Sequence, residues 1–145
     1  MNNEETKAKI SKAYNDLNVN TLDQLENFYA ETVEFHDPIG SINGLKNLKD
    51  YYREMYKNVK SISFEFHDFI IQDQNVVAFW TMTYSANILN GGAPIKVPGT
   101  SHLKFDDLGK VVFHRDYFDV GTMVYEHVPV VGFVIRKIKD SLEKK

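Results

Sequence analysis

Two short stretches of the chain carry ionisable side chains whose types and spacing could support proton transfer. The first is VEFHDPIG, in which His36 and Asp37 lie among apolar residues and directly precede Pro38. Two interpretations are open here. An aspartate before a proline commonly stabilises a turn through its side chain. Alternatively, the apolar neighbours Phe35 and Ile39 place the carboxylate at the lip of a hydrophobic cavity, where it could act as a general base.

The second stretch, VVFHRDYF, predicts a strand with two further ionisable side chains on one face. Side chains alternate along a strand, so His114 and Asp116 share a face with Val112 and Phe118. In an apolar cavity these two groups would form a site suited to moving protons. A buried hydrogen bond between them that only orders the sheet is the alternative. If the opposite face turns inward, the pocket is lined instead by Arg115, Tyr117 and Asp119.

Other chemistry has less support in the sequence. The chain has no cysteine, which excludes disulfides, thiolate catalysis and cysteine-based zinc sites. No spacing motif for metal ligands joins the two stretches described above, so we expect no bound metal and no cofactor. The remaining histidines indicate no specific chemistry: His67, His102 and His127.

Composition and charge indicate an ordinary globular domain. The 145 residues are 43% hydrophobic and 26% charged, which predicts a single domain over residues 1–145 with a substantial core. The formal net charge of −3 gives no reason to expect nucleic-acid binding. The polar start, MNNEETKAK, does not resemble a signal peptide, and no apolar run approaches the roughly 20 residues of a membrane span. We therefore expect a cytoplasmic protein.

The first part of the chain predicts helices with one short strand among them. Apolar residues recur at helical spacing over residues 4–18, which predicts an amphipathic helix. Thr21 begins a capping-box pattern and predicts a second helix over 22–29. A strand over 33–36 ends at the Asp-Pro turn, and a third helix follows over 44–59.

The second part of the chain changes to the period of two that is typical of strands. A strand begins at residue 62 and ends at a turn over 72–75. Three more strands are predicted over 76–89, 95–105 and 110–119, and the NGG sequence between the first two of these is a strong hairpin signal. An amphipathic helix over 130–145 follows.

This order of elements predicts an α+β fold. We expect a curved antiparallel sheet with the three N-terminal helices across its concave face and an amphipathic helix at the C-terminus. Such an arrangement encloses a cone-shaped space, which is where a pocket would form.

A family resemblance supports this architecture. The segment FYAETVEFHDPIGSINGLKNLKDYY resembles the same region of ketosteroid isomerase and the SnoaL-like polyketide cyclases, members of the NTF2-like superfamily. The shared features are an aromatic-Ala pair, a V-x-x-x-DP-x-G strand and turn, and a glycine-opened helix. The resemblance continues through LKFDDLGKVVFHRDYFD and thus covers most of the chain. It implies the cone-shaped NTF2-like fold.

The resemblance also implies roles for particular residues. Asp37 falls where the isomerase keeps its general base, and Asp116 is the nearest analogue of the acid–base aspartate of the cyclases. The isomerase has an oxyanion hole made by a tyrosine and a protonated aspartate. Ser101 occupies the aspartate position, and the tyrosine position falls on Ala13, with Tyr14 one residue away.

Strand alternation and the resemblance together predict the lining of the pocket. Large apolar side chains with a few polar groups suit an apolar small molecule that carries one or two oxygens. In addition to Asp37, His114 and Asp116 as catalytic candidates, the expected ligand-binding residues are Tyr14, Phe35, His36, Tyr52, Met55, Trp80, Met82, Val97, Ser101, Leu103 and Phe118.

Two surfaces suggest partners. The outer sheet face is expected to carry large apolar residues, among them Phe79, Val111, Phe113 and Tyr117, and the resemblance implies a homodimer through this face. The C-terminal helix combines an apolar stripe with basic residues that include Arg136, Lys144 and Lys145. This helix either caps the domain with a solvated face or makes peripheral contact with an anionic membrane.

Three functions follow from these expectations. The first is an enzyme of the SnoaL or ketosteroid isomerase type that uses carboxylate acid–base chemistry on an apolar, oxygen-bearing substrate. The second is a non-catalytic dimer that holds a hydrophobic ligand as a carrier or sensor. The third, an interaction adaptor that uses the outer sheet face, has the weakest support.

Overall fold

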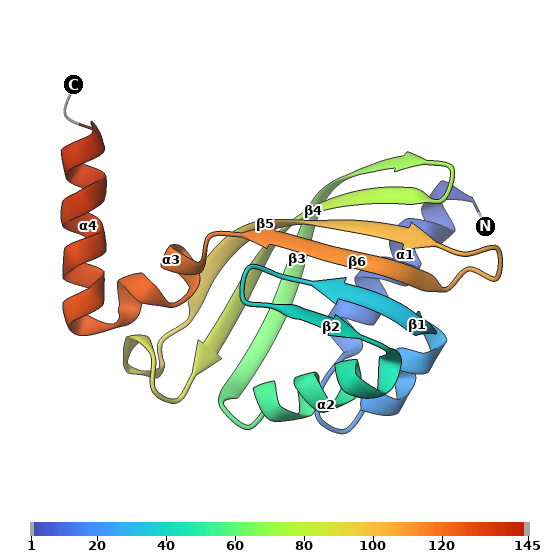
Figure 1. Ribbon diagram of the computed structural model, residues 1–145, viewed down its shortest axis with the longest axis horizontal. Coiled ribbons are helices and arrows are strands. Elements are labelled where there is room, and N and C mark those ends of the chain that lie inside the picture. The colour runs from blue at the N-terminus through green and yellow to red at the C-terminus, as the bar shows by residue number, and fades with distance from the viewer. Residues whose placement is uncertain (1, 144–145) are drawn as a thin grey trace.

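The structure, a computed structural model, describes residues 2–143 and has the expected α+β architecture (Figure 1). The N-terminal elements are α1 (Asn3–Asp16), the 3-10 turn η1 (Leu22–Asn27), β1 (Tyr29–His36), β2 (Ser41–Asn43) and α2 (Leu45–Met55). The strands that follow are β3 (Val59–Gln72), β4 (Asn75–Ala86), β5 (Ile95–Phe105) and β6 (Val111–Phe118), with η2 (Asn90–Gly92) between β4 and β5. The C-terminal elements are α3 (Val120–Met123), η3 (Tyr125–His127) and α4 (Pro129–Glu143).

The six strands form one curved sheet in the order β2-β1-β6-β5-β4-β3. Strands β3 to β6 make the expected antiparallel meander. The sheet is mixed, however, because β1 runs parallel to β6. No hairpin connects these two strands, so loop geometry does not force them to be antiparallel. This pairing brings the first candidate stretch, which ends β1, next to the second, which forms β6.

Helix α1 confirms the first predicted helix. Asn2 caps it, and the reciprocal hydrogen bonds between Asn2 and Glu5 form a capping box that satisfies the first free backbone N–H groups. Ile10, on the inner side of the helix, is fully buried. The helix therefore presents Tyr14, one turn further along the same side, toward the sheet.

The second predicted helix, over 22–29, is wrong in its length and its type. Only the six residues Leu22–Asn27 form a helical turn, and it is a 3-10 turn. Thr21 makes no side-chain cap, because its hydroxyl oxygen accepts from the backbone N–H of Asn18 instead. The chain is already extended at Tyr29, which pairs with Val111 of β6. Sheet pairing thus overrides a weak helical pattern.

The third predicted helix ends earlier than expected. It stops at Met55, and Val59 begins β3, where it pairs with Ala86 at the end of β4. The short strand β2 and the 3-10 turn η2 were not expected from the sequence. Asn90, Gly91 and Gly92, the NGG sequence, all adopt positive φ and turn the chain between β4 and β5.

An irregularity in β6 corrects the expected placement of Val111 and Val112. The register between β5 and β6 shifts between Lys104 and Phe105, which leaves Val112 without a partner. Val111 therefore pairs with Phe105 and is fully buried in the core, although simple alternation places it on the outer face. Such a bulge bends the strand and increases its twist. From His114 onward, alternation holds as expected.

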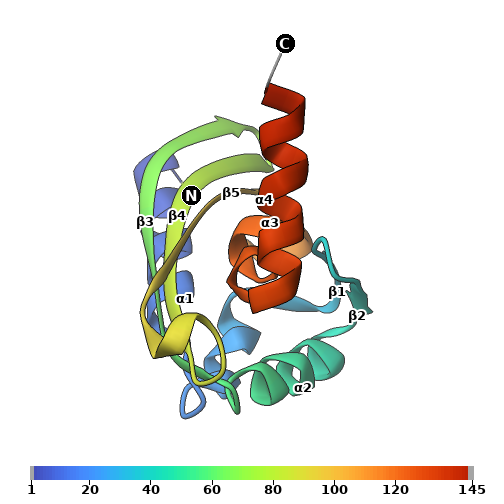
Figure 2. The same cartoon turned by 90° about the vertical axis from the view of Figure 1, so that its left-hand side faces the viewer.

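Helix α1 packs against β3, and helix α2 packs against β1 (Figure 2). The core has two parts, one around Ile10, Leu48 and Val111 and one around Trp80 and Val97. Helix α4 confirms the predicted C-terminal helix as far as Glu143, and residues 144–145 lie outside the described part of the chain. It extends away from the sheet and does not cap the domain (Figure 1).

Candidate functional site

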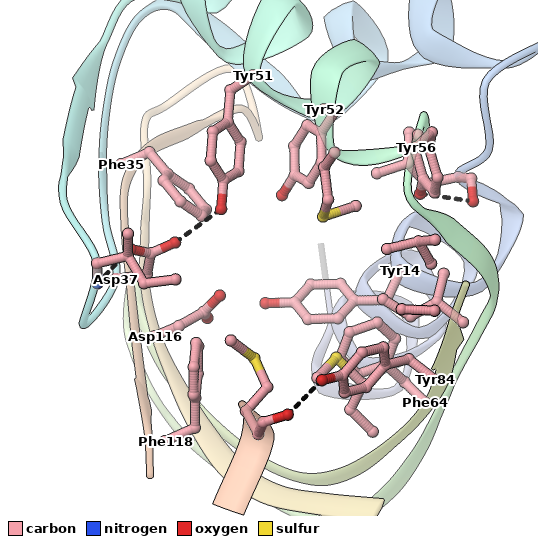
Figure 3. Close-up of a pocket in the computed structure, with 18 of the residues that line it drawn as sticks. Tyr14, Phe35, Asp37, Tyr51, Tyr52, Tyr56, Phe64, Tyr84, Asp116 and Phe118 are labelled. Atoms are coloured by element: carbon pink, nitrogen blue, oxygen red, sulfur yellow. Dashed lines mark hydrogen bonds between the residues drawn. The ribbon is translucent and has the colours of Figure 1, made fainter. Parts of the chain in front are cut away.

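A cavity of about 350 Å³ lies between the concave side of the sheet and the two helices (Figure 3). This volume is within the range of small-molecule sites. Its wall is predominantly apolar and draws on α1, α2 and four of the six strands, β1, β3, β4 and β6. Aromatic rings dominate the wall: Tyr14, Phe28, Tyr29, Phe35, Tyr51, Tyr52, Tyr56, Phe64, Trp80, Tyr84 and Phe118.

Ser101 on β5 is the centre of a hydrogen-bond network beneath this wall. It is fully buried, and its hydroxyl accepts from Tyr14 Oη at 2.7 Å and from Trp80 Nε1 at 2.9 Å. Its single proton is donated to Asp116 Oδ1 at 2.5 Å. Both acceptor positions and the donor of the hydroxyl are therefore used within the protein.

His114 is the second member of the network and is 2% exposed. Its Nδ1 lies 2.7 Å from Tyr29 Oη, and its Nε2 lies 2.6 Å from Asp116 Oδ1 and 3.1 Å from Tyr14 Oη. Because the hydroxyl of Tyr14 already donates to Ser101, Nε2 must donate here. Nδ1 then accepts from Tyr29. The contacts therefore select the tautomer of His114 that carries its proton on Nε2.

Asp116 joins this network to the cavity. Its Oδ1 accepts from Ser101 and His114, whereas none of the hydrogen bonds among the described residues involves Oδ2. The side chain is 16% exposed and contributes to the cavity wall, where it points toward the open space (Figure 3). One carboxylate oxygen is thus held in place, and the other is available to a bound molecule.

Asp37 reaches the cavity from the turn between β1 and β2. Its Oδ1 accepts from the backbone N–H groups of Ile39 and Gly40 at 2.8 and 2.9 Å, which is the turn-stabilising role of an aspartate. Its Oδ2 accepts from Tyr51 Oη at 3.0 Å, and the residue lines the cavity (Figure 3). The two interpretations of this residue are therefore compatible, because one carboxylate both closes the turn and faces the cavity.

The structure places most of the sequence-predicted residues at the cavity, and on β6 the face with His114 and Asp116 turns inward. Four predicted residues do not line the cavity. His36 points away from the cavity and contacts Ser41 through Nδ1 at 2.7 Å, while Val97 and Leu103 are fully buried in the core. Ser101 acts from below the wall through the network. The predicted residues that do line the cavity are Tyr14, Phe35, Asp37, Tyr52, Met55, Trp80, Met82, His114, Asp116 and Phe118.

Sequence reasoning missed two residues that hold the site together. The helix predicted over 22–29 ends at Tyr29, but this residue lies on β1 and holds His114. Tyr51 on α2 holds Asp37, and the helix predicted over 44–59 does not by itself indicate this contact. The role of Tyr29 can be found only from the pairing of β1 with β6, which places it next to His114.

The buried tyrosines remain protonated donors well above neutral pH. Burial is the main cause that raises the pKa of Tyr14, Tyr29 and Tyr52 far above the ordinary tyrosine value. The negative charge of Asp116 adds to this effect on each of them. Burial, followed by the charge of Asp37, also raises the pKa of Tyr51. These phenols are therefore neutral near pH 7, and those of Tyr14, Tyr29 and Tyr51 donate within the protein.

Two further properties of the described residues bear on function. No cluster of three or more histidine, aspartate or glutamate side chains with metal-binding geometry is found among residues 2–143. Among the helices in that part of the chain, none is long and apolar enough to cross a membrane.

Comparison with known proteins agrees with this geometry. A family model, the SnoaL-like domain, matches residues 10–114. No curated protein sequence matches the chain. Several solved structures are similar in fold.

The first is a hypothetical protein from Catenulispora acidiphila DSM 44928 with a ketosteroid isomerase-like fold, solved in complex with trimethylamine; the TM-score is 0.70 at 15% identity over 85% of this chain and 91% of that chain. The second is a protein assigned as a SnoaL-like polyketide cyclase from Jannaschia sp. CCS1. Its TM-score is 0.69, at 12% identity over 81% of this chain and 87% of that chain. The third is TerC, co-crystallised with polyporic acid. Its TM-score is 0.68, at 18% identity over 81% of this chain and 92% of that chain. At these identities the likeness shows the fold.

Proposed function

The chain belongs to the SnoaL-like domain family, and from this premise we propose that it is an enzyme that acts on an apolar, oxygen-bearing small molecule by carboxylate acid–base chemistry. One observation carries the proposal. Asp116 presents a carboxylate to a largely apolar cavity while Ser101 and His114 hold one of its oxygens. The trimethylamine and polyporic acid in two of the similar structures support small-molecule binding by proteins of this fold.

In the proposed step, Asp116 accepts a proton from the carbon next to a substrate carbonyl. The electron pair of the broken C–H bond forms a C=C bond, and the carbonyl π pair moves to the oxygen to give an enolate. Tyr52, whose hydroxyl points into the cavity, donates a hydrogen bond to that oxygen (Figure 3). When the substrate carries a β,γ C=C bond, this enolate is a conjugated dienolate; Asp116 then returns the proton to its γ-carbon, the double bond shifts to the α,β position, and the oxygen electron pair re-forms the carbonyl. The sequence of steps is an isomerisation and needs no further reactant.

His114 is a positioning residue in this scheme. It holds Asp116 through Nε2 and is itself held by Tyr29 through Nδ1, so the carboxylate has a fixed direction. Asp37 is a second carboxylate on the same cavity, and the family resemblance gives it the role of the base. We assign the proton transfer to Asp116, because all three contacts of Asp37 already serve the turn and Tyr51.

Hydrogen–deuterium exchange of a simple ketone tests this proposal. 2-Tetralone is an apolar ketone with acidic α-protons, and proton NMR in D₂O follows the loss of their signal. We expect the protein to accelerate this exchange. The D116N variant keeps the size and the acceptor oxygen of the side chain but not its basicity, so it should lower the acceleration by about 10²–10⁴-fold.

The D107N variant is the matched control, because Asp107 is an exposed aspartate that hydrogen-bonds Gln74 and does not line the cavity. It should exchange 2-tetralone at the wild-type rate. Thermal unfolding of D116N separates loss of the base from loss of the fold. Wild-type exchange by a folded D116N would remove Asp116 from the reaction.

A carrier or sensor of hydrophobic ligands is the second candidate function. The observation in its favour is that Ser101, at the position of an oxyanion-hole donor in the isomerase, gives its only proton to Asp116 and has none for a ligand. In the 2-tetralone experiment, this function corresponds to binding of the ketone without any acceleration of exchange.

The homodimer stays a prediction. Of the residues expected on the outer sheet face, Phe79 and Phe113 are partly exposed and Tyr117 is 53% exposed, whereas Val111 is buried. A second copy of this chain is the partner that the family resemblance implies for this face.

The membrane contact also stays a prediction. Helix α4 leaves a set of apolar side chains exposed to solvent: Val130, Val131, Phe133, Val134, Ile138 and Leu142. Arg136, Lys137 and Lys139 lie on the same helix. An apolar stripe with neighbouring basic residues is the pattern of helices that lie on anionic membranes.

A further inference from the structure

The charges on the cavity wall are all of one sign or already compensated. Among the described residues that line it, the acidic ones are Asp37 and Asp116, and no lysine or arginine is present. His114 contacts Asp116, and both of its ring nitrogens are engaged within the protein. The wall therefore offers no cation to an anionic ligand.

Asp37 is the acid whose charge has no cationic partner. The groups that contact its oxygens are two backbone N–H groups and the phenol of Tyr51, which are all neutral. No ion pair among the described residues includes Asp37. Because a charge next to low-dielectric walls is poorly screened, this carboxylate attracts a cation in the cavity more strongly than it would at an open surface.

The neighbouring rings favour the same kind of ligand. Phe35 and Tyr51 lie next to Asp37 on the wall, and Tyr52 follows along α2, with ring centroids 5.9 Å apart for Phe35–Tyr51 and 5.5 Å for Tyr51–Tyr52. Figure 3 shows Phe35 and Tyr51 near Asp37, with Tyr52 next to Tyr51. The faces of aromatic rings attract organic cations, as in the aromatic cages that bind ammonium groups.

The raised pKa values of the phenols reflect the same negative charges. The charge of Asp37 contributes to the raised pKa of Tyr51, and that of Asp116 contributes to the raised pKa of Tyr52, in both cases after burial. A field that disfavours a phenolate at these positions also disfavours an anionic ligand in the same space.

We propose that the cavity selects lipophilic cations, such as protonated amines, over anions of the same size, and that Asp37 with Phe35, Tyr51 and Tyr52 forms the cation subsite. The inference rests on the proposed function in that it narrows the substrate class of the same cavity. It gives the two carboxylates separate roles. Asp37 pairs with the ammonium group of the substrate, and Asp116 transfers the proton.

Three naphthalene derivatives of similar size and different charge test this selectivity. Isothermal titration at pH 7.5 compares naphthalen-2-ylmethylammonium, naphthalen-2-ylmethanol and 2-naphthoate with the full chain. We expect the ammonium compound to bind at least tenfold more tightly than the carboxylate, with the alcohol between them. D37N should weaken the ammonium compound at least tenfold and leave the alcohol within about twofold.

The E34Q variant is the matched control, because Glu34 is an exposed acid near the end of β1, three residues before Asp37, and does not line the cavity. It should bind all three probes like the wild type. The amide that D37N introduces retains an acceptor oxygen for the turn, so this variant is expected to fold, and binding of the alcohol verifies that it does. An equal affinity for ammonium and carboxylate, an equal effect of D37N and E34Q, or no binding of any probe would overturn the inference.

The outcome is independent of the proposed reaction. Probe binding requires no turnover, so charge selectivity can be present in a protein that does not exchange 2-tetralone. Conversely, exchange that depends on Asp116 can occur in a cavity that accepts anions as readily as cations. The two experiments therefore fail separately.

Discussion

The two carboxylates that face the cavity are held in different ways. Asp37 is fixed by its own turn, through backbone groups two and three residues further along the chain, and by one tyrosine. Asp116 is fixed by Ser101 of β5 and by His114 of its own strand, which lie in a buried network with Tyr14 of α1. The comparison teaches that the turn can hold its acid without the core. The buried contacts between β5 and β6, in contrast, cannot change without moving Asp116.

The largest expected effect comes from overpacking the contact between β4 and β5 beneath the cavity. A Cβ at Gly99 would lie within 2.8 Å of three atoms of the Trp80 indole ring, which is buried opposite it on β4. The ring cannot move aside without losing its hydrogen bond to Ser101. We expect G99A to lower the free energy of unfolding by about 3 kcal/mol, as overpacking of a core does. Urea unfolding measures it.

The matched variant in the turn is G40A. A Cβ at Gly40 meets no atom within 4 Å, and this glycine is not among those with positive φ. Its free energy of unfolding should stay within about 0.5 kcal/mol of the wild type. A G40A protein as unstable as G99A would break the comparison, because the turn would then be as tightly packed as the wall.

A smaller effect is expected when one hydroxyl is removed from each region. S101A deprives Trp80 Nε1 and Tyr14 Oη of their acceptor beneath the cavity, and we expect a loss of about 2 kcal/mol in the free energy of unfolding. S41A removes the exposed contact of Ser41 with His36 and should change it by less than about 0.5 kcal/mol. Equal losses of unfolding free energy in the two variants would show that water enters the buried network and replaces the hydroxyl of Ser101.

The same contrast explains which parts of the site were predictable. The Asp37 turn is encoded by adjacent residues, so its sequence was sufficient. The shared face of His114, Asp116 and Phe118 followed from strand alternation. His36, however, cannot line the cavity together with Phe35, because adjacent residues of one strand point to opposite faces.

Burial depth and partners were beyond local patterns. Alternation places Val97 and Leu103 on the inner face, but it does not tell whether a core or a cavity covers them, and both are fully buried. The bond from Tyr29 to His114 joins residues 85 positions apart and exists only because β1 pairs in parallel with β6. The overall α+β architecture was predictable because helical and strand periods segregate along the chain.

The smallest expected effect concerns alkaline pH and the phenols of the two regions. Burial raises the pKa of Tyr29 above its unfolded value of about 10, so the folded state keeps a proton that the unfolded state loses as the pH rises past 10. The free energy of unfolding therefore falls with pH in this window, by about 1.4 kcal/mol per pH unit for each such tyrosine. Below pH 10 the phenol is protonated in both states and contributes no pH dependence.

Y29F should make this alkaline decline shallower by about 1.4 kcal/mol per pH unit, since it removes one titrating group, while at pH 8 it costs about 1 kcal/mol through the lost hydrogen bond to His114. Y51F should change the slope by a similar amount, because burial and the charge of Asp37 also keep Tyr51 protonated in the folded state over this range. Urea unfolding at pH steps from 8 to 11 gives both slopes. If Y51F left the slope unchanged while Y29F made it shallower, the phenol of Tyr51 would lose its proton as readily as in the unfolded chain, and the Asp37 side of the cavity would be open to water where the Tyr29 side is closed.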